Sequence, residues 1–148
     1  MKLYIIGFLL LCNANVLAQT DSTYIGTFFN ADYKIFLNIN LINKNVIVTD
    51  QDIFGELDGY IGSDQSNHIW AIVSSEIKND KALLEIVNNY GSEDFHAILT
   101  KEKDGKLFFK HTGGSVLKFP VNGKWQKIPS KILFTRKVSN KKGVPAHH

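Results

Sequence analysis

Cysteine is almost absent from this 148-residue chain, in which Cys12 is the only one. A single cysteine excludes an intramolecular disulfide and a metal site built on several thiolates. The chain also has only three prolines and one methionine, and it contains no Asn-x-Ser/Thr acceptor for N-glycosylation. Ile, Asn and Lys are abundant, as is common in proteins from AT-rich bacterial genomes. These features favour a bacterial protein whose fold does not depend on disulfides.

Long apolar runs are also missing, and the one prominent run, Leu3–Cys12, is too short to span a bilayer. Crossing about 30 Å of hydrocarbon takes roughly 20 helical residues. Lys2 precedes the run, and Val16-Leu17-Ala18 places small or short side chains before Gln19. We expect residues 1–18 to be a cleavable signal peptide. The protein would then be exported, to the periplasm or the medium, with no transmembrane segment after processing.

Two alternatives for this N-terminal segment are less consistent with its residues. Bacterial lipoproteins acylate a cysteine that follows a small residue, usually Gly or Ala, but Leu11 precedes Cys12. The segment could also remain as an uncleaved anchor or a buried first strand, yet the small-residue site ending at Ala18 favours cleavage there. Cleavage after Ala18 removes the only cysteine from the mature chain.

The two parts of the mature chain carry charge of opposite sign. Residues 19–100 hold four basic side chains against twelve acidic ones, and residues 101–148 hold twelve basic ones against two acidic ones. This asymmetry indicates either a basic surface for an anionic partner or a closed sheet in which late strands neutralise early ones. Aromatic residues do not interleave with the lysines as in a stacking platform, so nucleic acid is not an expected partner.

Alternation of apolar and polar side chains is the dominant pattern of the mature chain. Tyr33, Ile35, Leu37, Ile39 and Leu41 share one face, and this period of two predicts a strand. Val46–Val48 is expected to pair with it as a hairpin. Similar patterns predict strands at 24–29, 55–62, 68–74, 95–100, 107–109, 116–119 and 132–136. Ala82–Asn88 fits a strand, or a short helix capped by Asp80; we favour the strand.

Turn residues divide these strands. Asp104-Gly105 predicts a tight hairpin turn, and Thr112–Ser115 predicts another. The glycines within Gly55–Gly62 predict a bulge. Pro120 lacks an N–H and is expected to end strand pairing, which leaves Val121–Ser130 as a loop.

About ten short strands without a strong helix predict one all-β domain over residues 19–137. We expect a single antiparallel meander that closes, or nearly closes, into a β-barrel, because closure removes the exposed edge strands. Residues 138–148 are expected to be a basic, disordered tail.

Gly26-Thr27-Phe28 near the start and Arg136 in the last predicted strand resemble the calycin barrels, which include lipocalin-like, avidin-like and fatty-acid-binding proteins. Lipocalins carry Gly-x-Trp in the first strand, and its ring packs on a basic side chain from near the end of the chain. Phe28 stands where lipocalins have tryptophan. The resemblance covers two short segments and implies the barrel architecture, not a function.

No metal or cofactor site is expected. Asp50, Asp52 and Gly55 have the order of a calcium loop, but Phe54 and Ile61 stand where oxygen ligands are required. Ordinary solvated turn acids explain them better. His68, His96 and His111 show no ligand spacing, and His147-His148 belong to the expected tail.

No catalytic residue is assigned either, so an enzyme is not the expected class. His96 lies two residues from Asp94, and Ser74 or Ser92 would complete a Ser/His/Asp set, but no spacing requires it. Glu56 and Asp58 would form a carboxylate pair on one strand face. A half-exposed strand histidine and solvent-facing carboxylates are the preferred interpretations.

The leading hypothesis is an exported, non-enzymatic barrel that binds a small apolar or amphipathic ligand. The candidate barrel liners, which would otherwise simply fill the core, are Leu37, Ile39, Trp70, Ile72, Phe95, Leu107 and Phe109. The alternative is a protein-interaction module, such as an inhibitor, an immunity protein or an envelope assembly factor. It would use the basic C-terminal third and Trp125.

Overall fold

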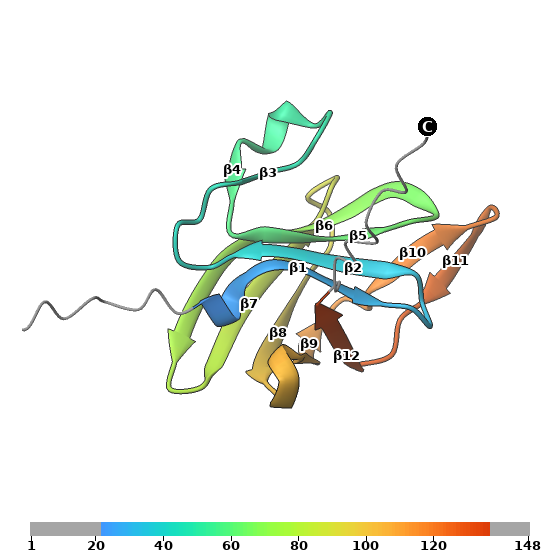
Figure 1. Cartoon of the computed structure of the whole chain (residues 1–148). Coiled ribbons are helices and arrows are strands. Elements are labelled where there is room, and N and C mark those ends of the chain that lie inside the picture. Colours follow the sequence, from blue (N-terminus) through green and yellow to red (C-terminus); the bar gives the residue numbers. More distant parts are fainter. Residues whose placement is uncertain (1–21, 137–148) are drawn as a thin grey trace, which may run out of the picture.

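A closed barrel of eight antiparallel strands forms the body of the protein in the computed structural model, which describes residues 22–136 (Figure 1). The barrel strands are β1 (Ile25–Asn30), β2 (Ile35–Asn40), β5 (Gly59–Ser63), β6 (Ser66–Lys78), β7 (Lys81–Asn88), β8 (Asp94–Lys101), β9 (Leu107–Gly114) and β12 (Lys131–Arg136). Each pairs with the next in chain order, and β12 pairs with β1. The predicted antiparallel meander is therefore confirmed. The expected signal peptide, residues 1–18, and the expected tail, residues 138–148, lie outside the described residues.

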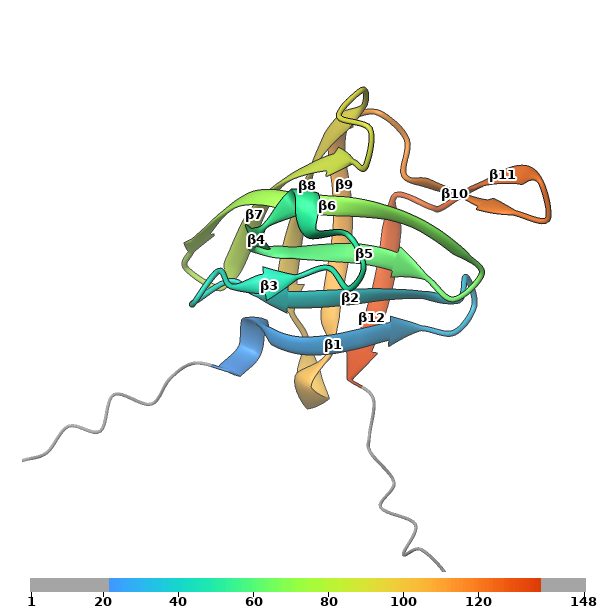
Figure 2. The same ribbon diagram turned by 90° about the horizontal axis from the view of Figure 1, so that it is seen from above.

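Four further strands form two small sheets outside the barrel. They are β3 (Val46–Ile47) with β4 (Glu56–Leu57), and β10 (Lys118–Val121) with β11 (Lys124–Lys127). Three single-turn 3₁₀ helices complete the description: η1 (Ser22–Tyr24), η2 (Asp52–Phe54) and η3 (Lys103–Gly105). Figures 1 and 2 show the β10–β11 hairpin extending away from the barrel. Within residues 22–136, no helix has the length and apolar character needed to cross a bilayer.

Several local expectations are confirmed. Ala82–Asn88 lies within strand β7, not in a helix. Asp104 and Gly105 adopt positive φ angles of 60° and 71° in the turn between β8 and β9. The register of β5 against β6 shifts between Ile61 and Ser63, which places an irregularity at Gly62 as the glycine pattern predicted.

The expected partner of Val46–Val48 is wrong. The edge of β2 that faces away from β1 is occupied by β5, so β3 pairs with β4 instead. The segment between β2 and β5 folds over the outside of the barrel, where Val48 and Leu57 are buried against Ile69 and Ala71. Burial of this second, smaller apolar cluster explains why the segment does not continue the barrel.

The expected loop from Val121 to Ser130 is also wrong, because most of it belongs to the β10–β11 hairpin. Asn122 and Gly123 have φ angles of 49° and 76°, which suit a two-residue hairpin turn. Pro120 pairs with Trp125 and does not end the strand. Each strand of a two-stranded ribbon has one unpaired edge, and a missing N–H at that edge removes no hydrogen bond between the strands.

The turn expected at Thr112–Ser115 is wrong as well. Thr112 to Gly114 continue strand β9 along β8, and a register shift between His96 and Ala97 absorbs an extra residue. Gly114, at a φ of 98°, approaches the backbone of Phe95 so closely that a Cβ there would lie 2.7 Å from its Cα. Two adjacent glycines therefore mark an irregular strand here and not a turn.

Large side chains fill the barrel interior. The largest that are fully buried include Trp70, Phe28, Phe95, Phe109 and Phe134. Ring contacts run through this core, with centroid separations of 5.2 Å for Trp70–Phe95, 6.3 Å for Phe95–Phe109 and 6.0 Å for Phe109–Phe134. An eight-stranded barrel is just wide enough for side chains to fill it, and these rings do so.

Arg136 joins the last strand to the first. Its guanidinium carbon lies 4.6 Å from the centroid of the Phe28 ring, while Nη1 donates to the Ile25 carbonyl at 2.8 Å and Nη2 to the Ser22 carbonyl at 2.6 Å. Gly26 makes this contact possible, because a Cβ at its φ of 130° would lie 2.6 Å from Arg136 Nη1. The packing of a first-strand ring on a late basic side chain, which the sequence resemblance implied, is present.

Replacing Arg136 by methionine should therefore destabilise the barrel. Arg136→Met keeps much of the side-chain stem but removes the cation over Phe28 and two charged hydrogen bonds, so the free energy of unfolding should fall by about 1–3 kcal/mol. Urea denaturation measures the change. Lys131→Met, an exposed position on the same strand, should cause no loss. Equal stability of the Arg136 and Lys131 variants would contradict this role for Arg136.

Candidate functional site

The seven expected barrel liners all face the interior. Leu37, Ile39, Trp70, Ile72, Phe95, Leu107 and Phe109 are each at most 1% exposed and belong to one apolar cluster. They pack on one another and on the rest of that cluster, and Trp70 and Phe95 also contact the rings of His68 and His111. None of the seven lines either of the two cavities described below. Contact of these side chains with a ligand stays a prediction.

Two of the residues considered for catalysis, Ser74 and His96, line the same cavity, but their arrangement does not suit a catalytic triad. Ser74, Glu85 and His96 occupy paired positions across β6, β7 and β8, and all three line a cavity of about 340 Å³ on the barrel wall. A nucleophile needs the histidine beside it, with the carboxylate behind the histidine. Here Glu85 stands between the other two, which places Ser74 and His96 two strand spacings apart, or about 10 Å. The row therefore has no activated nucleophile.

The other candidate groups have structural partners or remain solvated. Ser92 Oγ accepts a hydrogen bond from Asn88 Nδ2 at 3.0 Å, and Asp94 is exposed. Glu56 is exposed, but Asp58 is buried, so the expectation of two solvent-facing carboxylates is wrong for Asp58. Asp58 accepts a hydrogen bond from Ser75 Oγ and lies 3.5 Å from Lys44 Nζ. This carboxylate ties the start of β5 to its neighbours.

No metal centre emerges from the described residues. Asp50 and Asp52 are exposed, as expected of turn acids. His111 Nε2 lies 2.7 Å from the Ser115 carbonyl, and its ring stacks on Phe95 at 4.9 Å. Between residues 22 and 136, no three His, Cys, Asp or Glu side chains gather as metal ligands.

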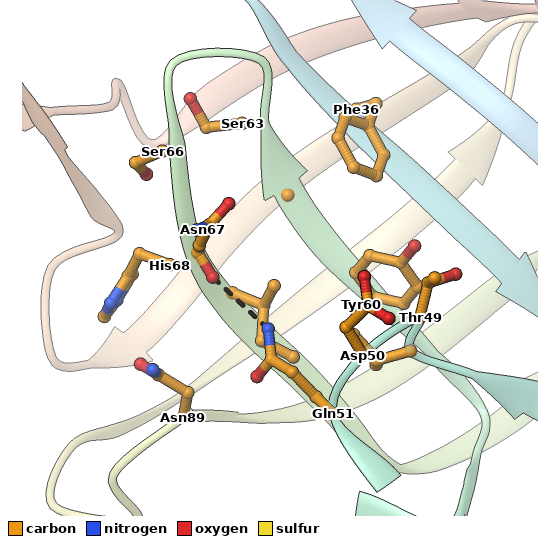
Figure 3. Close-up of a pocket in the computed structure, with 13 residues that line it drawn as sticks. Phe36, Thr49, Asp50, Gln51, Tyr60, Ser63, Ser66, Asn67, His68 and Asn89 are labelled. Carbon is orange, nitrogen blue, oxygen red and sulfur yellow. Dashed lines mark hydrogen bonds between the residues drawn. The ribbon is translucent and has the colours of Figure 1, made fainter.

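A larger cavity, of about 520 Å³, wraps around the beginning of β6 at one end of the barrel (Figure 3). We call it the end cavity. It is lined by Phe36, Val48, Thr49, Asp50, Gln51, Tyr60, Gly62, Ser63, Ser66, Asn67, His68, Ile69 and Asn89. In Figure 3 the ring of His68 lies on one side of β6, and the rings of Phe36 and Tyr60 lie on the other. The size is that of a site for a small molecule.

One side of the end cavity has an aromatic surface on the outside of the barrel. Phe36 and Tyr60 are half-buried and meet edge to face at 5.8 Å, and Phe29 extends the row at 6.3 Å from Phe36. The Phe36 ring lies on Gly62, where any side chain would collide with it. Thr49, Asp50 and the Gln51 side chain, whose Nε2 donates to the Asn67 carbonyl at 3.3 Å, border this surface.

The other side of the end cavity contains two unsatisfied polar atoms. Ser66 Oγ and Asn89 Oδ1 are buried, and neither has a hydrogen-bond partner among the described residues. Leaving such a group unpaired costs about 1–3 kcal/mol, so native proteins contain few of them. Both atoms belong to residues of the same cavity. This coincidence marks the end cavity as the best candidate site of the protein.

His68 connects the cavity to an aromatic cluster beneath the β10–β11 hairpin. Its ring centroid lies 5.4 Å from Trp125, 5.9 Å from Trp70 and Phe119, and 6.2 Å from Tyr90. Tyr90 and Trp125 are 79% and 55% exposed, so this cluster also presents aromatic surface to solvent. Trp70 Nε1 donates to the Lys118 carbonyl at 2.9 Å and fastens the hairpin to β6.

Burial lowers the pKa of His68 below its usual value of 6.5. Glu93 opposes this shift by its negative charge, and Lys118 adds to it by its positive charge. The imidazole is therefore neutral at neutral pH.

The end cavity is only weakly indicated by the sequence. Its residues come from β2, from the segment after β3, from β5 and β6, and from the residue after β7. Only His68 and Asp50 had been considered, each as a metal ligand. Two weak signals were available: polar residues in 63–68 between apolar strands, and the half-polar faces carrying Phe36 and Tyr60.

Acidification should destabilise the protein through His68. Above pH 6.5 the imidazole is neutral in both states; below it the unfolded chain binds a proton that the folded protein resists, so stability falls until the pH reaches the folded pKa. Thermal melts from about pH 7.5 to about pH 5 should show a smaller loss for His68→Gln than for the unaltered protein. His96→Gln, at an exposed position, should keep the original pH dependence. Identical pH profiles for all three proteins would refute this assignment.

Neither family models, nor curated proteins, nor solved structures match the chain. The function must therefore be inferred from the site itself.

Proposed function

We propose that this chain is an exported, non-enzymatic binding protein that takes a small amphipathic ligand in the end cavity. The observation that carries the proposal is the pair of buried, unpartnered atoms, Ser66 Oγ and Asn89 Oδ1, in one cavity of about 520 Å³. A ligand that hydrogen-bonds to both would remove a cost that the free protein bears. Export is supported by the signal-peptide pattern of residues 1–18.

The amphipathic character of the ligand follows from the two sides of the cavity. Phe36 and Tyr60 offer apolar ring surface, and Ser66, Asn67 and Asn89 offer hydrogen-bonding groups. Ligand sites usually combine apolar walls with a few placed polar groups in this way. Binding inside the barrel is less well supported, because aromatic rings such as Trp70 and Phe109 occupy the interior.

The barrel is further proposed to be of the calycin type. Support comes from eight antiparallel strands in consecutive order and from the contact of Phe28 with Arg136. Gly26 stands where that contact requires a glycine. This likeness concerns architecture and adds no ligand.

A second candidate function, recognition of a protein partner, is favoured by the β10–β11 hairpin. Lysines stand directly opposite each other at Lys118–Lys127 in the hairpin and at Lys110–Lys131 between β9 and β12. Like charges in such positions destabilise a sheet. Lys118 is paired with Glu93, but no ion pair is found for the other three within residues 22–136. The exposed Trp125, whose ring centroid lies 5.0 Å from Lys118 Nζ, would serve as an anchor for an acidic partner surface.

Native mass spectrometry tests the first candidate. Protein isolated from its own host should carry a small molecule that survives gentle ionisation. Phe36→Ala removes an aromatic wall of the end cavity and should reduce the liganded fraction about tenfold. Phe108→Ala, at a half-buried position on β9 outside the cavity, is the matched control and should retain the ligand. Ligand-free protein, or equal loss in both variants, would reject the end cavity as the site.

A pull-down from host extract tests the second candidate. Recognition that depends on charge should capture a partner at low salt. The partner should be lost at about 1 M salt, where the Debye length is only about 3 Å and exposed charges are strongly screened. Replacing Lys124 and Lys127 by glutamate should abolish capture at low salt, and replacing Lys101 and Lys103, away from the hairpin, should not. A partner held equally at both salt concentrations, or lost in neither variant, would contradict the charged hairpin as its site.

A further inference from the structure

On the Phe36 side of β6, the end cavity presents several groups that one small ligand can contact together. Phe36 belongs to β2, Tyr60 to β5 and Asn67 to β6, and these strands are consecutive neighbours in the barrel wall. Neighbouring strands lie about 4.8 Å apart, so the three strands span only about 10 Å. Asn89 follows β7, on the other side of β6 (Figure 3). Binding on the Phe36 side therefore needs no contact with Ser66 or Asn89.

The segment after β3 forms a second wall on this side. Tyr60 packs against the apolar cluster that contains Val48, and Asp50 follows Val48 by two residues. Gln51 Nε2 donates to the Asn67 carbonyl at 3.3 Å and so attaches the segment to β6. Asp50 and Tyr60 both line the cavity, and Figure 3 shows their side chains on the same side of β6. The Asp50 carboxylate therefore shares one space with the aromatic rings.

The charges around this space favour a cationic ligand. None of the thirteen described residues that line the cavity is Lys or Arg, and Asp50 is the only carboxylate among them. Residues 36–69, which supply all of the lining except Asn89, contain five acidic side chains and one basic side chain, Lys44. Lys44 is paired with Asp58 at 3.5 Å. The surplus of negative charge attracts cations to this face and repels anions.

Two polar side chains beside the rings offer hydrogen-bond acceptors. The Asp50 carboxylate is exposed, and no ion pair within residues 22–136 includes it. The Gln51 amide donates through Nε2, which leaves its Oε1 as an acceptor. An ammonium group has donors only, so it complements these acceptors, whereas a carboxylate or phosphate would gain no positive partner here.

The aromatic rings add a second attraction, which matters because an exposed carboxylate alone holds a cation weakly. The face of an aromatic ring attracts a cation that lies within about 6 Å of the ring centre. Phe36 and Tyr60 are half-buried and meet edge to face at 5.8 Å, and Phe29 extends the row at 6.3 Å from Phe36. The same row gives apolar surface to the uncharged part of a ligand.

We infer that the Phe36 side of the end cavity is a subsite for an organic ammonium group, which lies between the aromatic rings of Phe36 and Tyr60 and the carboxylate of Asp50. The apolar part of the ligand lies along Phe36 and Phe29. The inference rests on the end cavity being the ligand site, as proposed above, and assigns the charge of the ligand that this side selects.

Three amphiphiles with the same chain and different head groups test the charge preference. Octylamine, octan-1-ol and octanoate are titrated into the ¹⁵N-labelled protein without residues 1–18, and amide chemical shifts are followed. Octylamine should shift the amides of Asp50, Gln51, Gly62 and Asn67 in a saturable way. Octan-1-ol should bind about tenfold more weakly, and octanoate should give no saturable shift.

Two results of this titration would overturn the ammonium subsite. Octan-1-ol or octanoate that binds at these amides as tightly as octylamine would do so and leave the proposed function standing. The absence of a saturable shift from octylamine would also do so, and native mass spectrometry then decides the proposed function separately.

Asp50→Asn removes the charge with little change in shape. Asp50 has a φ of 62°, and asparagine adopts this left-handed conformation readily, so the segment should keep its fold. Affinity for octylamine should fall about tenfold while affinity for octan-1-ol stays unchanged. Asp52→Asn, at an exposed acid of the same segment that does not line the cavity, is the matched control and should keep octylamine affinity. Equal octylamine affinity in the two variants would overturn the contact assigned to Asp50.

Discussion

The contact between Arg136 and Phe28 lies where the two ends of the sheet meet. Arg136 belongs to β12 and reaches across β1 to the carbonyls of Ile25 and Ser22, while its guanidinium covers the Phe28 ring. Closure of the barrel between β12 and β1 leaves every barrel strand with two neighbours. Closure also sets the diameter, and at eight strands the interior is only as wide as the side chains that point into it. The packed aromatic core is a consequence of that geometry.

A filled interior is the reason why the proposed ligand site lies outside the barrel core. The segment between β2 and β5 covers part of the outer wall, and the β10–β11 hairpin stands beside the end of the barrel (Figure 2). Between them lie the end cavity and the aromatic cluster around His68. The rigid strands of the barrel therefore position the groups that can bind a ligand. The segment between β2 and β5 and the β10–β11 hairpin, which lie outside the eight-stranded meander, form the borders of this region.

The sequence predicted the barrel because its signal is local. Alternation in Ile35, Leu37 and Ile39 depends only on neighbours in one strand, and all three side chains face the core. The sequence does not predict the β10–β11 hairpin, because Pro120 indicates the end of a strand although the unpaired edge of a two-stranded ribbon tolerates proline. The end cavity was missed for a different reason. Phe36, Ser66 and Asn89 are far apart in the chain, and only the three-dimensional register places them around one space.

Closure of the barrel around a solid interior is the feature from which the location of the end cavity follows. Xenon binds in dry apolar cavities, so a crystal structure under xenon pressure tests that feature directly. A solid interior should hold no xenon among Trp70, Phe95 and Phe109. A well-occupied xenon site between those rings would show an interior cavity, and it would return the expected barrel liners to the position of leading ligand site.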